Sequence, residues 1–194
     1  MALTKVISEN GECLYDENYI DNPNFYFSTL KESLNWRIDQ IRLFGKVFDV
    51  PRMHAWYGDE DSFYSYSNIS LPINPWTKEL LFLKQKIEKE FSLRFNGVLC
   101  NYYRDGVDSN GWHSDDEKEL IRPTHIIGLS FGDNRSMQFR LKGQKKKSVD
   151  LELNSGSLIY MKAPHQDFWQ HQIPKRKNKK ERINLTFRLV EKLK

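Results

Sequence analysis

The chain has 194 residues, of which 39% are hydrophobic and 29% charged, and its formal net charge is +4. These values fit a globular chain long enough to bury a core in one domain, and they exclude a disordered or fibrous protein. Because no stretch approaches the ~18 apolar residues of a membrane helix, we expect no membrane partner. We expect an intracellular monomer, cytoplasmic in a bacterium or nuclear in a eukaryote.

Two helices and a hairpin are predicted in the first half of the chain. Asn22-Pro23 is typical of a helix cap followed by proline in the first turn, which predicts a helix through about Trp36. Aromatic and β-branched residues interrupted by turn formers predict a hairpin within 38–57. Asn74-Pro75 repeats the cap-and-proline pattern. The apolar residues after it share one helical face, which we expect to pack on the core: Trp76, Leu80, Leu83, Ile87 and Phe91.

Short β runs follow Asn96, and turn formers such as Asp105-Gly106 separate them. Helices followed by many short strands predict an α+β domain in which the sheets form a sandwich or jelly roll backed by the helices. The strands are expected at 98–104, 125–131, 137–141, 148–153, 157–161 and 183–190.

His113, Asp115 and His171 are candidate metal ligands. Residues two apart project from the same face of a strand, so His113 and Asp115 can point inward together at a strand end. Two histidines and one carboxylate can occupy one face of octahedral iron(II) and leave positions open for an organic acid and oxygen. His165 is a rival for the second histidine, and a zinc hydrolase would use the same kinds of ligand.

The last predicted strand carries polar residues on alternate positions, namely Arg182, Asn184, Thr186 and Arg188. Such a row needs a polar interior or solvent, and a jelly roll that encloses a metal and an acid provides that interior. Arg182 offers a planar guanidinium of the kind that holds a dicarboxylic acid. Zinc hydrolysis does not explain two arginines beside the metal, so the pattern favours an iron oxygenase that consumes an organic acid.

Five segments carry recognisable motifs: Asn101 to Gly106, Trp112 to Glu117, Ser130-Phe131-Gly132, Trp169-Gln170-His171 and Arg182 to Arg188. In these segments the chain resembles the AlkB family of iron- and 2-oxoglutarate-dependent dioxygenases, in particular its DNA-repair branch. The resemblance runs from about Phe44 to Val190 and implies a double-stranded β-helix. It predicts one domain over 1–194, with a nucleotide-recognition lid at about 38–75 and a catalytic jelly-roll core at about 96–190.

The resemblance implies Fe(II), 2-oxoglutarate and O2 as cofactors and cosubstrates. His113, Asp115 and His171 match the family's iron ligands. Arg182 would pair with the distal carboxylate of 2-oxoglutarate. The other residues that match the pocket for this acid are Asn101, Tyr103, Asn184 and Arg188. Glu181 stands where the family usually carries proline, which implies a changed loop backbone before Arg182.

The resemblance also implies contacts with a flipped base. Phe44-Gly45-Lys46 matches a finger that inserts an apolar wedge into a duplex, although a Phe packed in the core is the alternative. Arg52, Tyr64, Tyr66 and Ser67 lie in the segment that matches the lid over the base pocket. Asp116 and Glu117 could accept from an exocyclic amine or lie in a solvated loop. The basic runs 145–147 and 175–180 could meet phosphates.

The function implied is oxidative demethylation of 1-methyladenine and 3-methylcytosine in DNA, with release of formaldehyde and succinate. The same chemistry on RNA or on a protein side chain is an alternative. A further alternative is a nucleic-acid-binding module without catalysis, but such a module has no use for an intact set of ligands and arginines.

Overall fold

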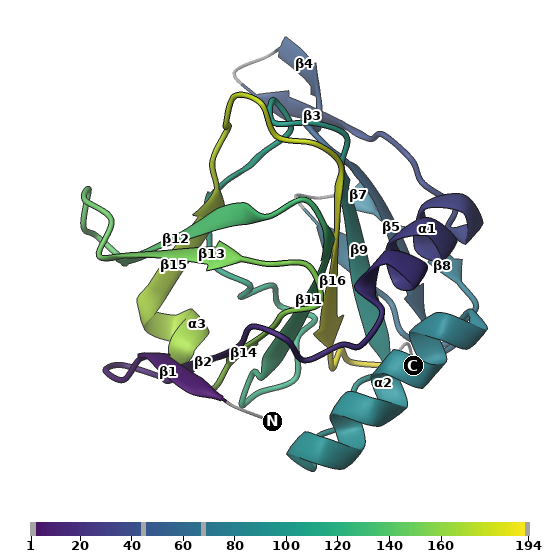
Figure 1. Ribbon diagram of the computed structural model, residues 1–194, viewed down its shortest axis with the longest axis horizontal. Coiled ribbons are helices and arrows are strands. Elements are labelled where there is room, and N and C mark those ends of the chain that lie inside the picture. The colour runs from purple at the N-terminus through teal and green to yellow at the C-terminus, as the bar shows by residue number, and fades with distance from the viewer. Residues whose placement is uncertain (1–2, 44–45, 67–68, 193–194) are drawn as a thin grey trace.

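The computed structural model describes residues 3–43, 46–66 and 69–192. Within them two β-sheets face each other, and the two longer helices lie on the outer side of the larger sheet (Figure 1). The larger, major sheet has eight strands in the order β1 (Thr4–Ile7), β2 (Cys13–Asp16), β14 (Leu158–Met161), β11 (Ile126–Gly132), β16 (Arg182–Arg188), β9 (Gly97–Tyr103), β5 (Met53–Gly58) and β8 (Ile73–Asn74).

The minor sheet has four strands in the order β10 (Asn110–His113), β15 (Trp169–Ile173), β12 (Arg135–Leu141) and β13 (Val149–Leu153). All its pairs are antiparallel. In the major sheet, β16 pairs with both β9 and β11, which places it at the centre. Two facing sheets of this kind form a jelly roll, so the α+β jelly roll predicted from the sequence is confirmed.

Alternate side chains of β16 point to opposite sides of the major sheet. Ile183, Leu185 and Phe187 face the helices and join the cluster that includes Leu30 and Leu83. The alternate residues face the minor sheet and line a pocket. A second apolar cluster, which includes Trp56, Met137, Phe139 and Ile159, fills the space around that pocket between the sheets. Each face of the central strands is therefore buried, one apolar and one partly polar.

Both predicted helices exist, but their ends differ from the prediction. Helix α1 (Pro23–Ser33) begins at the proline as expected and ends before Trp36, because Leu34 turns to an extended conformation. Helix α2 (Lys78–Phe91) begins four residues after Asn74. Asn74 belongs to β8, and Thr77 is the N-cap, whose side chain accepts from the Leu80 N–H. The buried face of α2 is confirmed at Leu80, Leu83 and Ile87.

The hairpin expected within 38–57 is formed by β3 (Gln40–Leu43) and β4 (Lys46–Asp49), which pair with each other apart from the main sheets. The rest of that segment is β5 of the major sheet, paired with β9 and β8. A second short pair, β6 (Ser65–Tyr66) and β7 (Ile69–Ser70), follows in the predicted lid. Phe44, Gly45 and Ser67 lie outside the described residues.

All six predicted strands are present within two residues of the expected starts. Among the described residues, six other strands were not predicted, namely β1, β2, β6, β7, β8 and β15, along with the short helix α3 (His165–Phe168). Strand β10 ends at His113, so the expectation that this residue stands at a strand end is correct.

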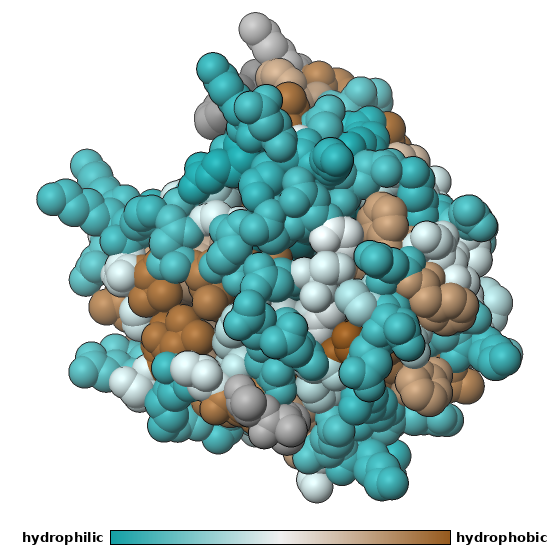
Figure 2. All heavy atoms as spheres, viewed as in Figure 1, coloured by the Kyte–Doolittle hydropathy of each residue, from teal (hydrophilic) through white to brown (hydrophobic). Residues whose placement is uncertain are grey.

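Both basic runs lie on the surface. Lys145, Lys146 and Lys147 are exposed at the β12–β13 turn, and Lys175, Lys177 and Lys180 are exposed between β15 and β16. Hydrophilic residues cover the corresponding parts of the face shown in Figure 2, at its left edge and upper centre. Among the described residues, no helix has the length and apolar character needed to cross a membrane.

Candidate metal centre and acid pocket

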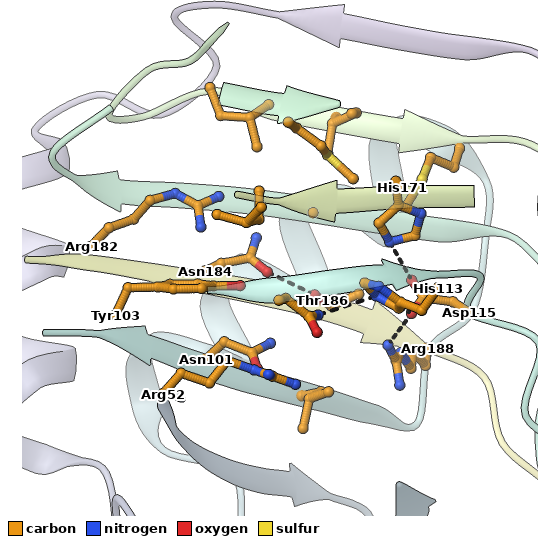
Figure 3. Close-up of a pocket in the computed structure, with 18 residues that line it drawn as sticks. Arg52, Asn101, Tyr103, His113, Asp115, His171, Arg182, Asn184, Thr186 and Arg188 are labelled. Atoms are coloured by element: carbon orange, nitrogen blue, oxygen red, sulfur yellow. Dashed lines mark hydrogen bonds and ion pairs between the residues drawn. The ribbon is translucent and has the colours of Figure 1, made fainter. Parts of the chain in front are cut away.

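A pocket opens between the two sheets, and polar side chains lie at both of its ends (Figure 3). His113, Asp115 and His171 gather at one end. Arg182 lies at the other end. The space between them is lined by residues of the central strands β9 and β16, including Asn101. The pocket thus has a metal-ligand end and a cationic end.

The three candidate ligands converge because β10 and β15 are neighbours. His113 stands opposite His171 in the antiparallel register, and Asp115 follows two residues after β10 ends. The Nε2 atoms of His113 and His171 lie 3.8 and 3.9 Å from the two carboxylate oxygens of Asp115. Ligand atoms from all three residues lie within 4.8 Å of one another. This spacing allows one ion to contact all three.

Burial gives the two histidines the protonation state of metal ligands. It lowers the pKa of His113 to about 4 and that of His171 well below its usual value, so both rings are neutral and can offer a lone pair. Burial also raises the pKa of Asp115 well above its usual value, and the negative charges of Glu117 and Asp116 raise it further. A divalent cation would offset that penalty on Asp115. Two neutral imidazoles and one carboxylate suit iron(II).

His165 is not part of this cluster. Its side chain is fully buried and lies parallel to the Trp169 ring at 6.0 Å, with Phe139 on another side. Neither ring nitrogen has a hydrogen-bond partner among the described residues, and burial lowers its pKa to about 4. Of the two rival histidines, only His171 lies with His113 and Asp115.

Arg188 fixes the orientation of the Asp115 carboxylate. Its Nη2 donates to Asp115 Oδ1 at 2.6 Å, and its Nη1 lies 3.5 Å from Glu117 Oε1. Tyr64 donates to the same Glu117 oxygen at 2.6 Å, and its ring lies 4.8 Å below the Arg188 guanidinium. Burial lowers the pKa of Arg188 to about 9 and raises that of Glu117 to about 7. Arg188 is therefore placed at the metal-ligand end.

Arg182 has the geometry of a carboxylate clamp. The side chain is 1% exposed and donates from Nη2 to Ser130 Oγ at 2.9 Å. Its guanidinium lies 5.2 Å from the Tyr103 ring centre. Nε and Nη1 are buried and have no partner among the described residues, and burial lowers the pKa of the group to about 10. Unpaired donors on a buried cation are costly, so the group fits an anionic ligand.

The other predicted acid-binding residues lie between the two ends. Asn101 Oδ1 accepts from Arg52 Nε at 2.7 Å. Asn184 donates to the Leu129 carbonyl at 3.1 Å and accepts from Thr186 at 2.9 Å. The pocket is lined by the side chains of Arg52, Asn101, Asn184, Thr186 and Tyr103. The structure thus brings Asn101, Tyr103, Arg182, Asn184 and Arg188 to one cavity.

The predicted substrate-binding residues are placed less uniformly. Arg52 lines the pocket and is 2% exposed. Tyr64 is fully buried, with its ring stacked on Trp56 at 4.4 Å. Asp116 is exposed and pairs with Lys142 at 2.8 Å, whereas Glu117 is half-buried. The structure describes the backbone of Lys46 and Tyr66 but not their side chains.

Ser130 accepts a hydrogen bond from the pocket residue Arg182, although the sequence assigned it no role. The alternation of β11 puts Ser130 on the pocket face together with Gly128, opposite the core residues Leu129 and Phe131. The available signals were this alternation and the Ser130-Phe131-Gly132 motif, and neither shows that Ser130 reaches Arg182.

Glu181, the residue before β16, forms an ion pair with helix α1. Its carboxylate accepts from the Tyr102 hydroxyl and pairs with Lys31 of α1 at 2.7 Å. These contacts hold the start of β16 against α1 and β9. The hydrogen bonds to Lys31 and Tyr102 lower the pKa of Glu181. The side chain therefore restrains the residue that precedes Arg182.

Replacing Glu181 by alanine is expected to lower the free energy of unfolding by about 1 kcal/mol, because the Tyr102 hydroxyl loses its acceptor. Urea denaturation measures the change. Glu32→Ala, an exposed position on the same helix that carries Lys31, is the matched control. Equal stability of the two variants would show that the Glu181 contacts contribute nothing.

Sequence and structure comparisons identify similar proteins. A family profile described as the 2OG-Fe(II) oxygenase superfamily matches residues 22–188. The alpha-ketoglutarate-dependent dioxygenase alkB homolog 3 of Bos taurus is 42% identical over 154 residues, which are 74% of this chain and 53% of that protein. The DNA oxidative demethylase ALKBH2 of Mus musculus is 38% identical over 159 residues, 78% of this chain and 66% of that protein.

The solved structure of OsALKBH1 has the same fold, with a TM-score of 0.63 at 14% identity over 91% of this chain and 97% of the other. The chain spans about half the length of the alkB homolog 3 relatives it matches. The family profile spans all the residues that line the pocket described above.

Proposed function

The chain belongs to the AlkB family of the 2OG-Fe(II) oxygenase superfamily, and from that premise we propose that it removes N-methyl groups from DNA bases by oxidation. The observation that carries this proposal is the pocket itself. It joins a His113–Asp115–His171 cluster to a buried Arg182 with unpaired donors. No non-catalytic binding role accounts for that combination.

We propose His113, Asp115 and His171 as the ligands of Fe(II), and Arg182 as the partner of the distal carboxylate of 2-oxoglutarate. With O2, the bound iron and 2-oxoglutarate supply hydroxylation of the N-methyl carbon, and the products are succinate, carbon dioxide, formaldehyde and the unmethylated base. Arg188 holds the Asp115 carboxylate in place. Asn101 and Tyr103 would contact the acid between the two ends.

DNA is the proposed substrate because ALKBH2 relatives are named DNA oxidative demethylases. The segment 38–75 would form the lid over the base, with the β3–β4 hairpin as its finger. In the view of Figure 1 this hairpin and the β15–β16 connection both lie at the top of the molecule. Arg176 anchors that connection through its N–H, which donates to the Gly106 carbonyl at 2.8 Å. The exposed lysines of this connection are therefore held at the Arg182 end.

Formaldehyde release is the direct test. Oligonucleotides that carry 1-methyladenine or 3-methylcytosine should be offered as single-stranded DNA, duplex DNA and RNA, with and without 2-oxoglutarate, and an unmethylated strand serves as the control. We expect formaldehyde from methylated DNA only when 2-oxoglutarate is present. Release from RNA alone would assign the same chemistry to RNA. No release from any nucleic acid would refute the proposal.

A bound metal is expected to stabilise the fold. At a free Mn(II) concentration of 100 times the dissociation constant, binding contributes about 2.7 kcal/mol, which corresponds to a rise in Tm of roughly 5–10 °C for a chain of this size. Thermal unfolding with Mn(II), and then with added EDTA, measures the rise and its reversal. Mg(II) is the control, because it prefers oxygen ligands to imidazole.

Binding of methylated DNA is expected to weaken steeply with salt. Each lysine that meets a phosphate contributes about 0.9 to the slope of log affinity against log salt for duplex DNA, or about 0.7 for a single strand. Lys175→Gln with Lys177→Gln should therefore lower the slope by about one to two. Lys78→Gln with Lys89→Gln removes the same charge from the exposed side of α2 and should not change it. Equal slopes for the two double variants would exclude the 175–180 run as a phosphate contact.

A further inference from the structure

A buried amide side chain supports the carboxylate corner of the proposed metal centre. Gln166 lies in α3 and is 1% exposed. Its Oε1 accepts a hydrogen bond from the backbone N–H of Asp115 at 2.9 Å. Its Nε2 lies 3.3 Å from the sulfur of Met161, which lines the pocket. Gln166 thus connects the backbone of a candidate ligand to the pocket wall.

The position of Asp115 explains why this contact matters. Strand β10 ends at His113, so the ladder that pairs β10 with β15 does not extend to Asp115. A buried backbone N–H outside a ladder needs another acceptor, and Gln166 provides it. Without that bond the main chain at Asp115 would be held only through its neighbours and its carboxylate.

A second bond joins the same two segments. The Ser114 hydroxyl donates to the Trp169 carbonyl at 2.8 Å. Consecutive residues 114 and 115 are therefore both bonded to the segment 166–169, which continues directly into β15 and His171. The Asp115 side of the site and the His171 side are thus held at a fixed separation. Arg188 sets the rotation of the carboxylate, and Gln166 sets the place of its main chain.

We propose that Gln166 is a positioning residue for the metal centre: its hydrogen bond to the Asp115 backbone holds the carboxylate where both histidine Nε2 atoms can share its ion. This inference rests on the proposed function only in that the three residues bind a divalent metal. Groups that orient metal ligands typically contribute about 10–100-fold to metal affinity. Loss of the Gln166 acceptor should therefore weaken metal binding and change the coordination geometry.

Co(II) titration tests the proposal, because the visible absorption of bound Co(II) reports both affinity and coordination geometry. Gln166→Met keeps the length of the side chain and removes the acceptor. We expect it to bind Co(II) at least about tenfold more weakly and with a changed spectrum. Gln166→Glu retains an oxygen at the same position and should restore the wild-type spectrum. Calorimetric titration with Mn(II) provides an independent affinity.

Gln172→Met is the matched control. Gln172 lies next to His171 on β15 but donates to Gln138 at 2.8 Å instead of contacting the Asp115 segment. The same substitution there should leave Co(II) affinity and spectrum unchanged. Thermal unfolding of each variant separates a local change at the site from loss of the fold.

A folded Gln166→Met protein with wild-type Co(II) affinity and spectrum would overturn the proposal. If that variant does not fold, Gln166→Asn, which is smaller and cannot span the distance to Asp115, carries the same expectation and the same overturning result. Wild-type protein that binds no Co(II) would refute the metal centre itself. Normal Co(II) binding without formaldehyde release would refute the proposed reaction and leave the role of Gln166 standing.

Discussion

Asp115→Asn is expected to lower the rate of formaldehyde release from methylated DNA by more than about 100-fold, since even residues that only orient metal ligands contribute 10–100-fold. The substitution removes the negative charge that would bind the ion and retains an oxygen that can accept from Arg188. The measurement is the initial rate at saturating 2-oxoglutarate, together with calorimetric Mn(II) affinity. Both should fall together.

The choice of asparagine follows from the surroundings of Asp115. Arg188 is 2% exposed and donates to this carboxylate at 2.6 Å. Alanine would leave that buried cation short of a partner, at a cost of about 3–5 kcal/mol, and the protein could lose activity by unfolding. Asp21→Ala, an exposed change before α1, is the control and should keep the wild-type rate. Undiminished Mn(II) binding by Asp115→Asn would contradict the assignment of this ligand.

Strands with one apolar and one polar face could be predicted from the sequence, whereas strands with mixed inner faces could not. Strand β16 alternates apolar and polar residues, and the structure gives each face a separate environment. Strand β15 also alternates, but its inward residues are Trp169, His171 and Ile173. Because His171 stands between two apolar residues, the apolar alternation of β15 cannot be recognised from the sequence. The burial of His171 depends on its partner strand β10.

The helix ends show the same dependence on tertiary contacts. Asn74-Pro75 has the composition of a helix start, yet Asn74 pairs with Tyr57 of β5 and donates to the Trp56 carbonyl. That strand contact is invisible in the local sequence. Thr77 then caps α2 through its side chain.

The candidate site was predictable where residues are close in the sequence or alternate along one strand. His113 and Asp115 are two residues apart, and Arg182 and Arg188 share the polar face of β16. Gln166 was not predictable, because its role comes from a four-residue helix that meets a loop 51 positions away. Tyr64 was expected at the base pocket, but it stacks on the nearby Trp56, and its bond to Glu117 spans 53 positions of the chain.

Replacing Arg182 by methionine is expected to separate stability from cosubstrate binding. The buried guanidinium has unpaired Nε and Nη1 atoms among the described residues, so an apolar side chain of similar length should leave the free energy of unfolding unchanged or raise it. Removal of one partner from a buried charge pair costs about 2–5 kcal/mol of binding, which corresponds to a loss of roughly 30-fold to several-thousandfold in 2-oxoglutarate affinity.

Calorimetry with Mn(II)-loaded protein measures the affinity for 2-oxoglutarate, and urea denaturation measures stability. Arg140→Met is the matched control, because Arg140 lies over the Trp112 ring and donates to Gln170 outside the pocket. It should bind 2-oxoglutarate as the wild type does. If Arg182→Met also binds normally, the distal carboxylate must pair with another guanidinium of the pocket. Arg52 and Arg188 are the other two that line it, and Arg188 already holds Asp115, so Arg52 would then be the group to replace.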